Sequence, residues 1–74
     1  MDALDRPTVY RARIARAKQL GDAADIIEGL RRDYYAARAR DYLREWLRTE
    51  PVPTSEHRTA LAALLLDGVA DEAA

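Results

Sequence analysis

Apolar and polar residues follow a helical spacing over residues 23–49, the longest continuous pattern in the chain. This stretch is rich in charged residues and is followed by Pro51 and Pro53, so the pattern predicts one long helix. Gly29 lies inside it, where a glycine weakens a helix unless it serves packing. We expect Gly29 to permit the close approach of a neighbouring helix. The alternative is a weak point at which the helix bends.

The apolar residues of this predicted helix lie on two different faces. At about 100° per residue, one side carries Ile26, Ile27, Leu30, Tyr34 and Ala37, and the nearly opposite side carries Tyr35, Ala39, Tyr42, Leu43, Trp46 and Leu47. In the second half of the helix, the first sector is filled by Asp41, Arg44, Glu45 and Arg48. Supercoiling shifts an apolar stripe by only about 20° per heptad. The pattern therefore predicts two packing partners, one at each end of the helix.

The first partner is a predicted helix over residues 7–20, which begins at Pro7 and is stopped by Gly21. Its apolar stripe consists of Tyr10, Ile14 and Ala17, with Val9 and Leu20 on the flank and Leu4 able to pack back onto it. Asp22 is the expected N-cap of the long helix. Because this connection is short, the two helices should be antiparallel neighbours. The face with Ile27, Leu30 and Tyr34 should then meet Tyr10, Ile14 and Leu20.

The second partner is a predicted helix over residues 55–66. Pro51-Val52-Pro53 forms an extended connector, Thr54 is the expected N-cap, and Gly68 follows the end of the helix. The predicted buried stripe is Leu61, Leu64 and Leu65, packing on Tyr42, Leu43, Trp46 and Leu47. Residues 67–74 are expected to be a frayed tail. The fold class is therefore all-α, a single small domain in which two shorter helices flank a long central one.

The composition provides little material for a core. The chain has 74 residues, and 15 of its apolar residues are alanine. Domains of this size usually need a disulfide, a metal or a partner subunit. Cysteine is absent and there is one histidine, so the composition favours self-association, as a homodimer or larger homo-oligomer.

The net charge of −1 favours neither nucleic acid nor a membrane surface, but the charge is unevenly distributed. Between residues 6 and 18 there are five basic residues and no acidic one, namely Arg6, Arg11, Arg13, Arg16 and Lys18. They are the candidates for contacts with DNA phosphates in an alternative interpretation. No apolar run has the length of a membrane span and no signal peptide is evident. We therefore expect a cytoplasmic location.

No pattern in the sequence indicates catalysis, a cofactor or a metal site. His57, the single histidine, is placed in the first turn of a predicted helix, where a structural role is expected. We therefore expect a protein that is not an enzyme. Tyrosine, tryptophan and arginine are common in protein interfaces, and the candidates for binding a partner are Tyr35, Tyr42, Trp46, Arg40, Arg44 and Arg48. The alternatives are ordinary core packing for the aromatic residues and a solvated, salt-bridged face for the arginines.

Residues 37–66, ARARDYLREWLRTEPVPTSEHRTALAALLL, resemble a pattern in short proteins of actinobacteria and their phages or integrated elements. That pattern has an acidic-Tyr-aliphatic helix end, a Pro/Thr linker, Glu-Gln-Arg and a Leu-rich helix, and His57 stands here where glutamine is usual. The resemblance implies a setting and transfers no catalytic residue. The expected function is a non-enzymatic interaction protein that self-associates and binds a host or phage protein. The alternative is a small DNA-binding accessory factor that uses the basic first helix.

Overall fold

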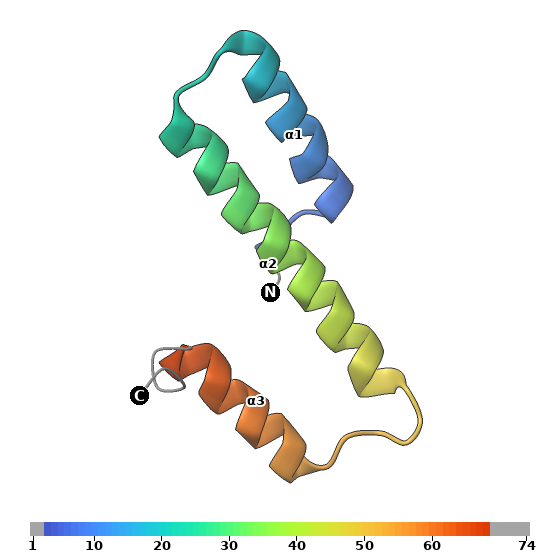
Figure 1. Cartoon of the computed structure of the whole chain (residues 1–74). Coiled ribbons are helices and arrows are strands. Elements are labelled where there is room, and N and C mark those ends of the chain that lie inside the picture. The colour runs from blue at the N-terminus through green and yellow to red at the C-terminus, as the bar shows by residue number, and fades with distance from the viewer. Residues whose placement is uncertain (1–2, 69–74) are drawn as a thin grey trace. The chain divides into compact units, whose positions relative to one another are not determined.

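The computed structural model describes residues 3–68, which form three α-helices: α1 (Pro7–Leu20), α2 (Ala24–Arg48) and α3 (Ser55–Asp67) (Figure 1). This part of the chain contains no strand, so the all-α class and the long central helix are confirmed. Each helix boundary lies within one residue of its prediction. The predicted frayed tail is wrong at Asp67, which belongs to α3, and its residues 69–74 lie outside the described residues.

Two compact units divide the chain, residues 1–44 and residues 45–74, and α2 contributes to both. Unit 1 is a hairpin of α1 and the first part of α2. Unit 2 contains the end of α2, the connector and α3. We describe each unit by itself.

The turn between α1 and α2 is defined by hydrogen bonds at the end of α1. Gly21 adopts a left-handed conformation (φ 68°), its N–H donates to the Lys18 carbonyl at 3.2 Å, and the N–H of Asp22 donates to the Ala17 carbonyl at 2.9 Å. This pair of bonds is the Schellman motif, which favours glycine at the left-handed position. The prediction of Asp22 as the N-cap of α2 is wrong. The carbonyl of Ala23 accepts from the N–H groups of Ile26 and Ile27, so α2 begins at Ala24 and its N-cap position is Ala23, one residue later than expected.

Unit 1 has a small core between its antiparallel helices (Figure 1). Tyr10 and Ala17 of α1 are each 4% exposed, and Ala37 of α2 is fully buried. Four further apolar side chains are half-buried on the predicted faces, namely Ile14, Ile27, Leu30 and Tyr34. The predicted inward faces are thus confirmed, except that Leu20 is 65% and Ile26 is 51% exposed. Leu20 is the last residue of α1, directly before the turn that leads to α2.

The expected close approach at Gly29 is wrong. A Cβ atom added to Gly29 would meet no atom within 4 Å, although the residue is half-buried. Ala17 of α1 and Ala37 of α2 are buried instead, and small side chains at buried positions allow helices to pack closely.

In unit 2 a capping box begins α3. The Oγ1 atom of Thr54 accepts from the N–H of His57 at 3.2 Å, and Nδ1 of His57 accepts from the N–H of Thr54 at 3.3 Å. His57 therefore occupies the position that Glu or Gln usually takes in this motif. The Glu50–Pro51 peptide bond in the connector is cis. Thr54 is confirmed as the N-cap, and His57 has a structural contact in the first turn.

No side chain of α3 is buried, so the predicted leucine stripe is wrong as a core. Leu61 is half-buried, whereas Leu64 is 40% and Leu65 is 68% exposed. Trp46, expected to be covered by these leucines, is only half-buried. Of the other residues predicted to cover α3, Tyr42 and Leu47 are exposed. Besides its leucines, the apolar residues of α3 are only Ala60, Ala62 and Ala63, whose short side chains add little area to a core.

Candidate interaction surfaces

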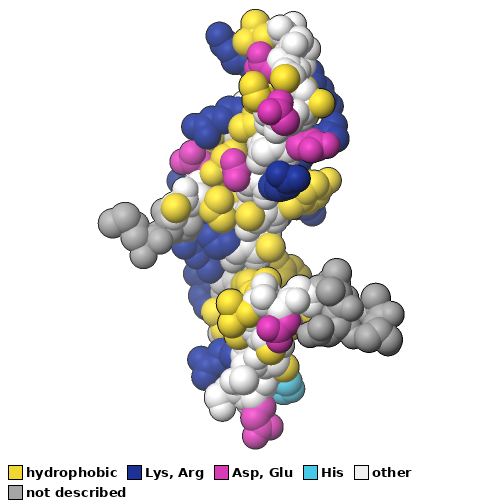
Figure 2. Space-filling model, turned by 90° about the vertical axis from the view of Figure 1, so that its left-hand side faces the viewer, with side chains coloured by type: hydrophobic (Ala, Val, Ile, Leu, Met, Phe, Trp, Pro, Cys, Tyr) yellow, Lys and Arg dark blue, Asp and Glu magenta, His cyan; other side chains and the backbone are white. Residues whose placement is uncertain are grey.

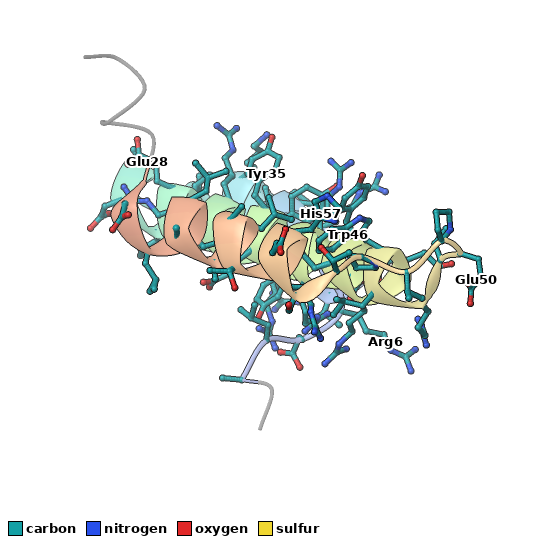
Figure 3. All side chains as sticks on the ribbon, turned by 90° about the horizontal axis from the view of Figure 1, so that it is seen from below. Arg6, Glu28, Tyr35, Trp46, Glu50 and His57 are labelled. Atoms are coloured by element: carbon teal, nitrogen blue, oxygen red, sulfur yellow. The ribbon has the colours of Figure 1, made fainter. Side chains whose placement is uncertain are left out.

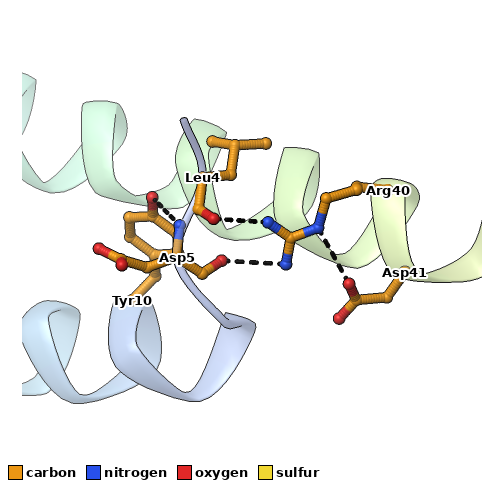
Figure 4. Close-up of polar contacts among 5 residues, drawn as sticks. All are labelled: Leu4, Asp5, Tyr10, Arg40 and Asp41. Carbon is orange, nitrogen blue, oxygen red and sulfur yellow. Dashed lines mark hydrogen bonds and ion pairs between the residues drawn. The ribbon is translucent and has the colours of Figure 1, made fainter. Parts of the chain in front are cut away.

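Arg40 connects α2 to the segment that precedes α1 (Figure 4). Its Nη1 atom donates to the carbonyl of Leu4 at 2.6 Å, and its Nη2 atom donates to the carbonyl of Asp5 at 3.1 Å. Its Nε atom donates to a carboxylate oxygen of Asp41 at 3.0 Å, and the Arg40 side chain is only 16% exposed. Bonds from a charged donor are stronger than those between neutral groups. Arg40 therefore fastens the N-terminal segment to α2.

The same segment is fastened to α1 at Asp5. The N–H of Asp5 donates to the hydroxyl oxygen of Tyr10 at 3.0 Å, which satisfies the polar end of a buried ring (Figure 4). The Asp5 carboxylate lies 3.3 Å from a guanidinium nitrogen of Arg13, whose guanidinium carbon is 5.6 Å from the Tyr10 ring centroid. These contacts with Tyr10, Arg13 and Arg40 form what we call the N-terminal clamp.

The arginine row proposed for partner binding is divided among three environments. Arg40 donates to backbone carbonyls in the N-terminal clamp, so it has a structural role that its spacing did not reveal. Arg48 lies 3.4 Å from Glu45, with both side chains about three-quarters exposed (74% and 73%). Arg44 is exposed. The solvated, salt-bridged alternative therefore describes Arg48, while Arg40 fits neither interpretation.

The two tyrosines of the aromatic candidate set are exposed on α2. Tyr35 is 61% and Tyr42 is 72% exposed, and they are seven residues apart with exposed Ala39 between them. Figure 3 shows Tyr35 projecting away from the ribbon, and its ring lies 5.3 Å from that of Tyr34. We call Tyr35, Ala39 and Tyr42 the tyrosine face. Trp46, four residues further along α2, is half-buried.

Unit 2 also exposes large hydrophobic side chains. Its exposed large hydrophobic residues are Leu47, Val52, Leu64, Leu65 and Leu66, which we call the leucine surface. Leu66 is 86% exposed. This exposure was not predicted, although the sequence carries a signal for it: three consecutive leucines on a helix point about 100° apart and cannot all face one core. Figure 2 shows hydrophobic side chains at the molecular surface among basic and acidic ones.

The basic residues proposed for DNA contacts are all exposed: Arg6, Arg11, Arg13, Arg16 and Lys18. The structure does not gather them at one point, because they are distributed along the whole of α1 and before it. Arg13 is also engaged with Asp5 and with the Tyr10 ring. Arg13 is therefore less available to a phosphate backbone than the other four basic residues.

Residues 3–68 contain no group of three or more His, Cys, Asp or Glu side chains that could hold a metal ion. Within the same residues, no helix is both long and apolar enough to cross a bilayer. The exposed apolar side chains of the described residues are the candidate functional features.

Comparison with known proteins leaves the two surfaces as the basis for assigning a function. No protein-family model matches the chain, and neither a curated protein nor a solved structure matches it. The tyrosine face and the leucine surface are therefore the candidate functional features of the described residues.

Proposed function

We propose that this chain is a non-enzymatic helical interaction protein that self-associates and binds another protein through its exposed apolar side chains. One observation carries the proposal. Among residues 3–68, nine large hydrophobic residues are exposed, whereas the buried residues are one tyrosine and two alanines. Such a distribution is the reverse of that in a stable monomer, whose large side chains are mostly inside.

Association would stabilise the chain by covering this apolar area. Burial of apolar surface contributes about 25 cal/mol per Å², and contiguous exposed apolar patches on soluble proteins commonly mark interaction sites. A chain without cysteine, in which only three side chains of residues 3–68 are buried, has few other sources of stability. Self-association and partner binding use the same kind of surface, and each unit exposes apolar side chains.

The biological setting that we propose is an actinobacterial phage or integrated element, with a host or phage protein as the partner. This part rests on the resemblance of residues 37–66 to short proteins from that source. DNA binding through α1 is the weaker alternative. Arg13 is already paired, and the net charge of −1 provides no general attraction to phosphate.

Self-association is tested by light scattering and by thermal unfolding at protein concentrations from about 2 to about 200 μM. The expected mass is at least twice the 8.3 kDa of the chain. The expected unfolding midpoint rises by several degrees over this range, because association stabilises the folded state by mass action. A mass of one chain throughout, with a constant midpoint, would remove the proposal.

Two variants on α3 test whether the leucine surface mediates self-association. Leu65→Glu places a charge on the leucine surface, where the side chain is 68% exposed, and Ala63→Glu places the same charge on a different side of α3. If the leucine surface mediates association, Leu65→Glu lowers the mass and Ala63→Glu does not. Equal behaviour of the two variants would exclude this surface.

A further inference from the structure

The tyrosine face continues along α2 as a short heptad pattern. Tyr35, Ala39, Tyr42 and Trp46 are separated by four, three and four residues, which is the spacing of the a and d positions of a coiled coil. All four lie on the single helix α2, which runs from Ala24 to Arg48. The first three are exposed and the fourth is half-buried. This spacing is typical of a helix that pairs with another helix.

The charged residues beside this seam can pair with the same residues of a second copy. Arg38 and Glu45 each precede a seam residue, Ala39 and Trp46 respectively, so both lie on the same flank of α2. The guanidinium of Arg38 is 5.7 Å from the centroid of the Tyr34 ring, and the Glu45 side chain is 73% exposed. One flank therefore carries a basic and an acidic side chain seven residues apart.

This flank selects one orientation of a second copy. In an antiparallel dimer, a two-fold axis perpendicular to the helices brings this flank of one α2 against the same flank of the other. Arg38 of each copy can then face Glu45 of the second copy. A parallel dimer would instead bring this flank against the opposite one, where Ala36 and Leu43 lie. Only the antiparallel arrangement pairs the charges, twice by symmetry.

The sizes of the seam residues favour the same arrangement. The register that pairs the charges places Ala39 opposite Tyr42 of the second copy and Tyr35 opposite its Trp46. A small residue then faces a large one, as interdigitating helices require. An in-register parallel pair would set Ala39 against Ala39 and Tyr42 against Tyr42. The alanine layer would then be underpacked and the tyrosine layer overcrowded.

We infer that α2 pairs antiparallel with α2 of a second copy of this chain, through the seam from Tyr35 to Trp46 and two Arg38–Glu45 ion pairs. This inference rests on the proposed self-association and specifies its geometry. The occupant is a second copy because the flank complements itself, whereas an unrelated helix would need its own matching charges. The leucine surface then remains for the other protein.

Charge exchange tests the inference, with association measured by sedimentation at about 150 mM salt. Arg38→Glu and Glu45→Arg each turn two attractive contacts into repulsive ones, and each is expected to weaken the dimer about ten-fold or more. The double variant Arg38→Glu/Glu45→Arg has the net charge of the wild type and is expected to recover its affinity to within about three-fold. An equimolar mixture of the two single variants is expected to form the heterodimer in preference to either homodimer.

Arg48→Ala is the matched control, because it breaks the intrahelical pair of Glu45 without touching the seam flank. It is expected to leave association unchanged, and circular dichroism checks that every variant keeps its helix content. If the wild type associates but the double variant does not recover, the antiparallel pairing is wrong and self-association stands. If the wild type is monomeric throughout, both the pairing and the proposed self-association are overturned.

Discussion

Units 1 and 2 both contain parts of α2, but their contacts differ in range along the sequence. In unit 1, Arg40 donates hydrogen bonds to residues 36 and 35 positions earlier in the chain, and three side chains are buried between two helices. In unit 2, the side-chain hydrogen bonds of the described residues connect partners three or four positions apart, and no side chain is buried. Unit 1 thus has tertiary structure of its own, whereas unit 2 has mainly well-formed secondary structure.

This contrast shows what a helix cap can and cannot provide. The capping box at Thr54 and His57 specifies where α3 begins, as clearly as the Schellman motif specifies where α1 ends. A cap satisfies backbone groups at the end of one helix, but it buries no apolar area. The leucine surface is the apolar area that remains, so unit 2 is the part of the chain that gains most from a partner.

The test with the largest expected effect compares the most buried aromatic side chain of unit 1, Tyr10, with Trp46 of unit 2. Tyr10→Ala removes a ring that is 4% exposed and is expected to cost about 3 to 5 kcal/mol, most of the stability of so small a domain. Trp46→Ala removes a half-buried side chain and is expected to cost about 1 to 2 kcal/mol at low protein concentration, where association does not contribute. Urea unfolding followed by circular dichroism measures both.

Tyr10→Phe is the control for the first variant, since it keeps the ring and removes only the acceptor of the Asp5 N–H. It is expected to cost about 1 kcal/mol. A Trp46→Ala variant as unstable as Tyr10→Ala would mean that unit 2 has a core equal to that of unit 1, and the contrast would be wrong.

The positions of the helices could be predicted because the signals that set them are local. Pro7 and Gly21 bound α1, and Thr54 begins α3, each through contacts within a few residues. The inward face of α2 in unit 1 was also predictable, since Ile27, Leu30 and Tyr34 repeat with helical spacing. Leu65 fits the same kind of pattern but is exposed, because a pattern shows which face is apolar and not whether another element is large enough to cover it.

The role of Arg40 could not be predicted, because its partners are backbone carbonyls 35 and 36 residues away. Carbonyl groups occur at every residue, so a sequence carries no signal for which of them an arginine will meet. In the sequence Arg40 looks like one member of a row with Arg44 and Arg48. Only the folded hairpin distinguishes it from the other two.

The second test concerns the N-terminal clamp. Arg40→Gln removes bonds from a charged donor to the carbonyls of Leu4 and Asp5 and is expected to cost about 1.5 to 3 kcal/mol. Arg48→Gln removes an ion pair whose side chains are about three-quarters exposed, and is expected to change stability by less than about 0.5 kcal/mol. Urea midpoints compare the two variants. Equal effects would show that the long-range contacts of unit 1 contribute no more than a surface pair.

The smallest effects are expected at the cap of α3, because the contacts there are local and exposed. Thr54→Ala removes the acceptor for the N–H of His57 and is expected to cost about 1 kcal/mol, whereas Thr54→Ser keeps the hydroxyl and is expected to be nearly neutral. His57→Gln is expected to preserve the box, since a glutamine oxygen can accept from the N–H of Thr54, while His57→Ala loses that bond. Melting curves followed by the fluorescence of Trp46, the single tryptophan, report on unit 2. If His57→Gln destabilises unit 2 as much as His57→Ala, then His57 does more than close the box, and unit 2 depends on an interaction of its imidazole ring beyond this local contact.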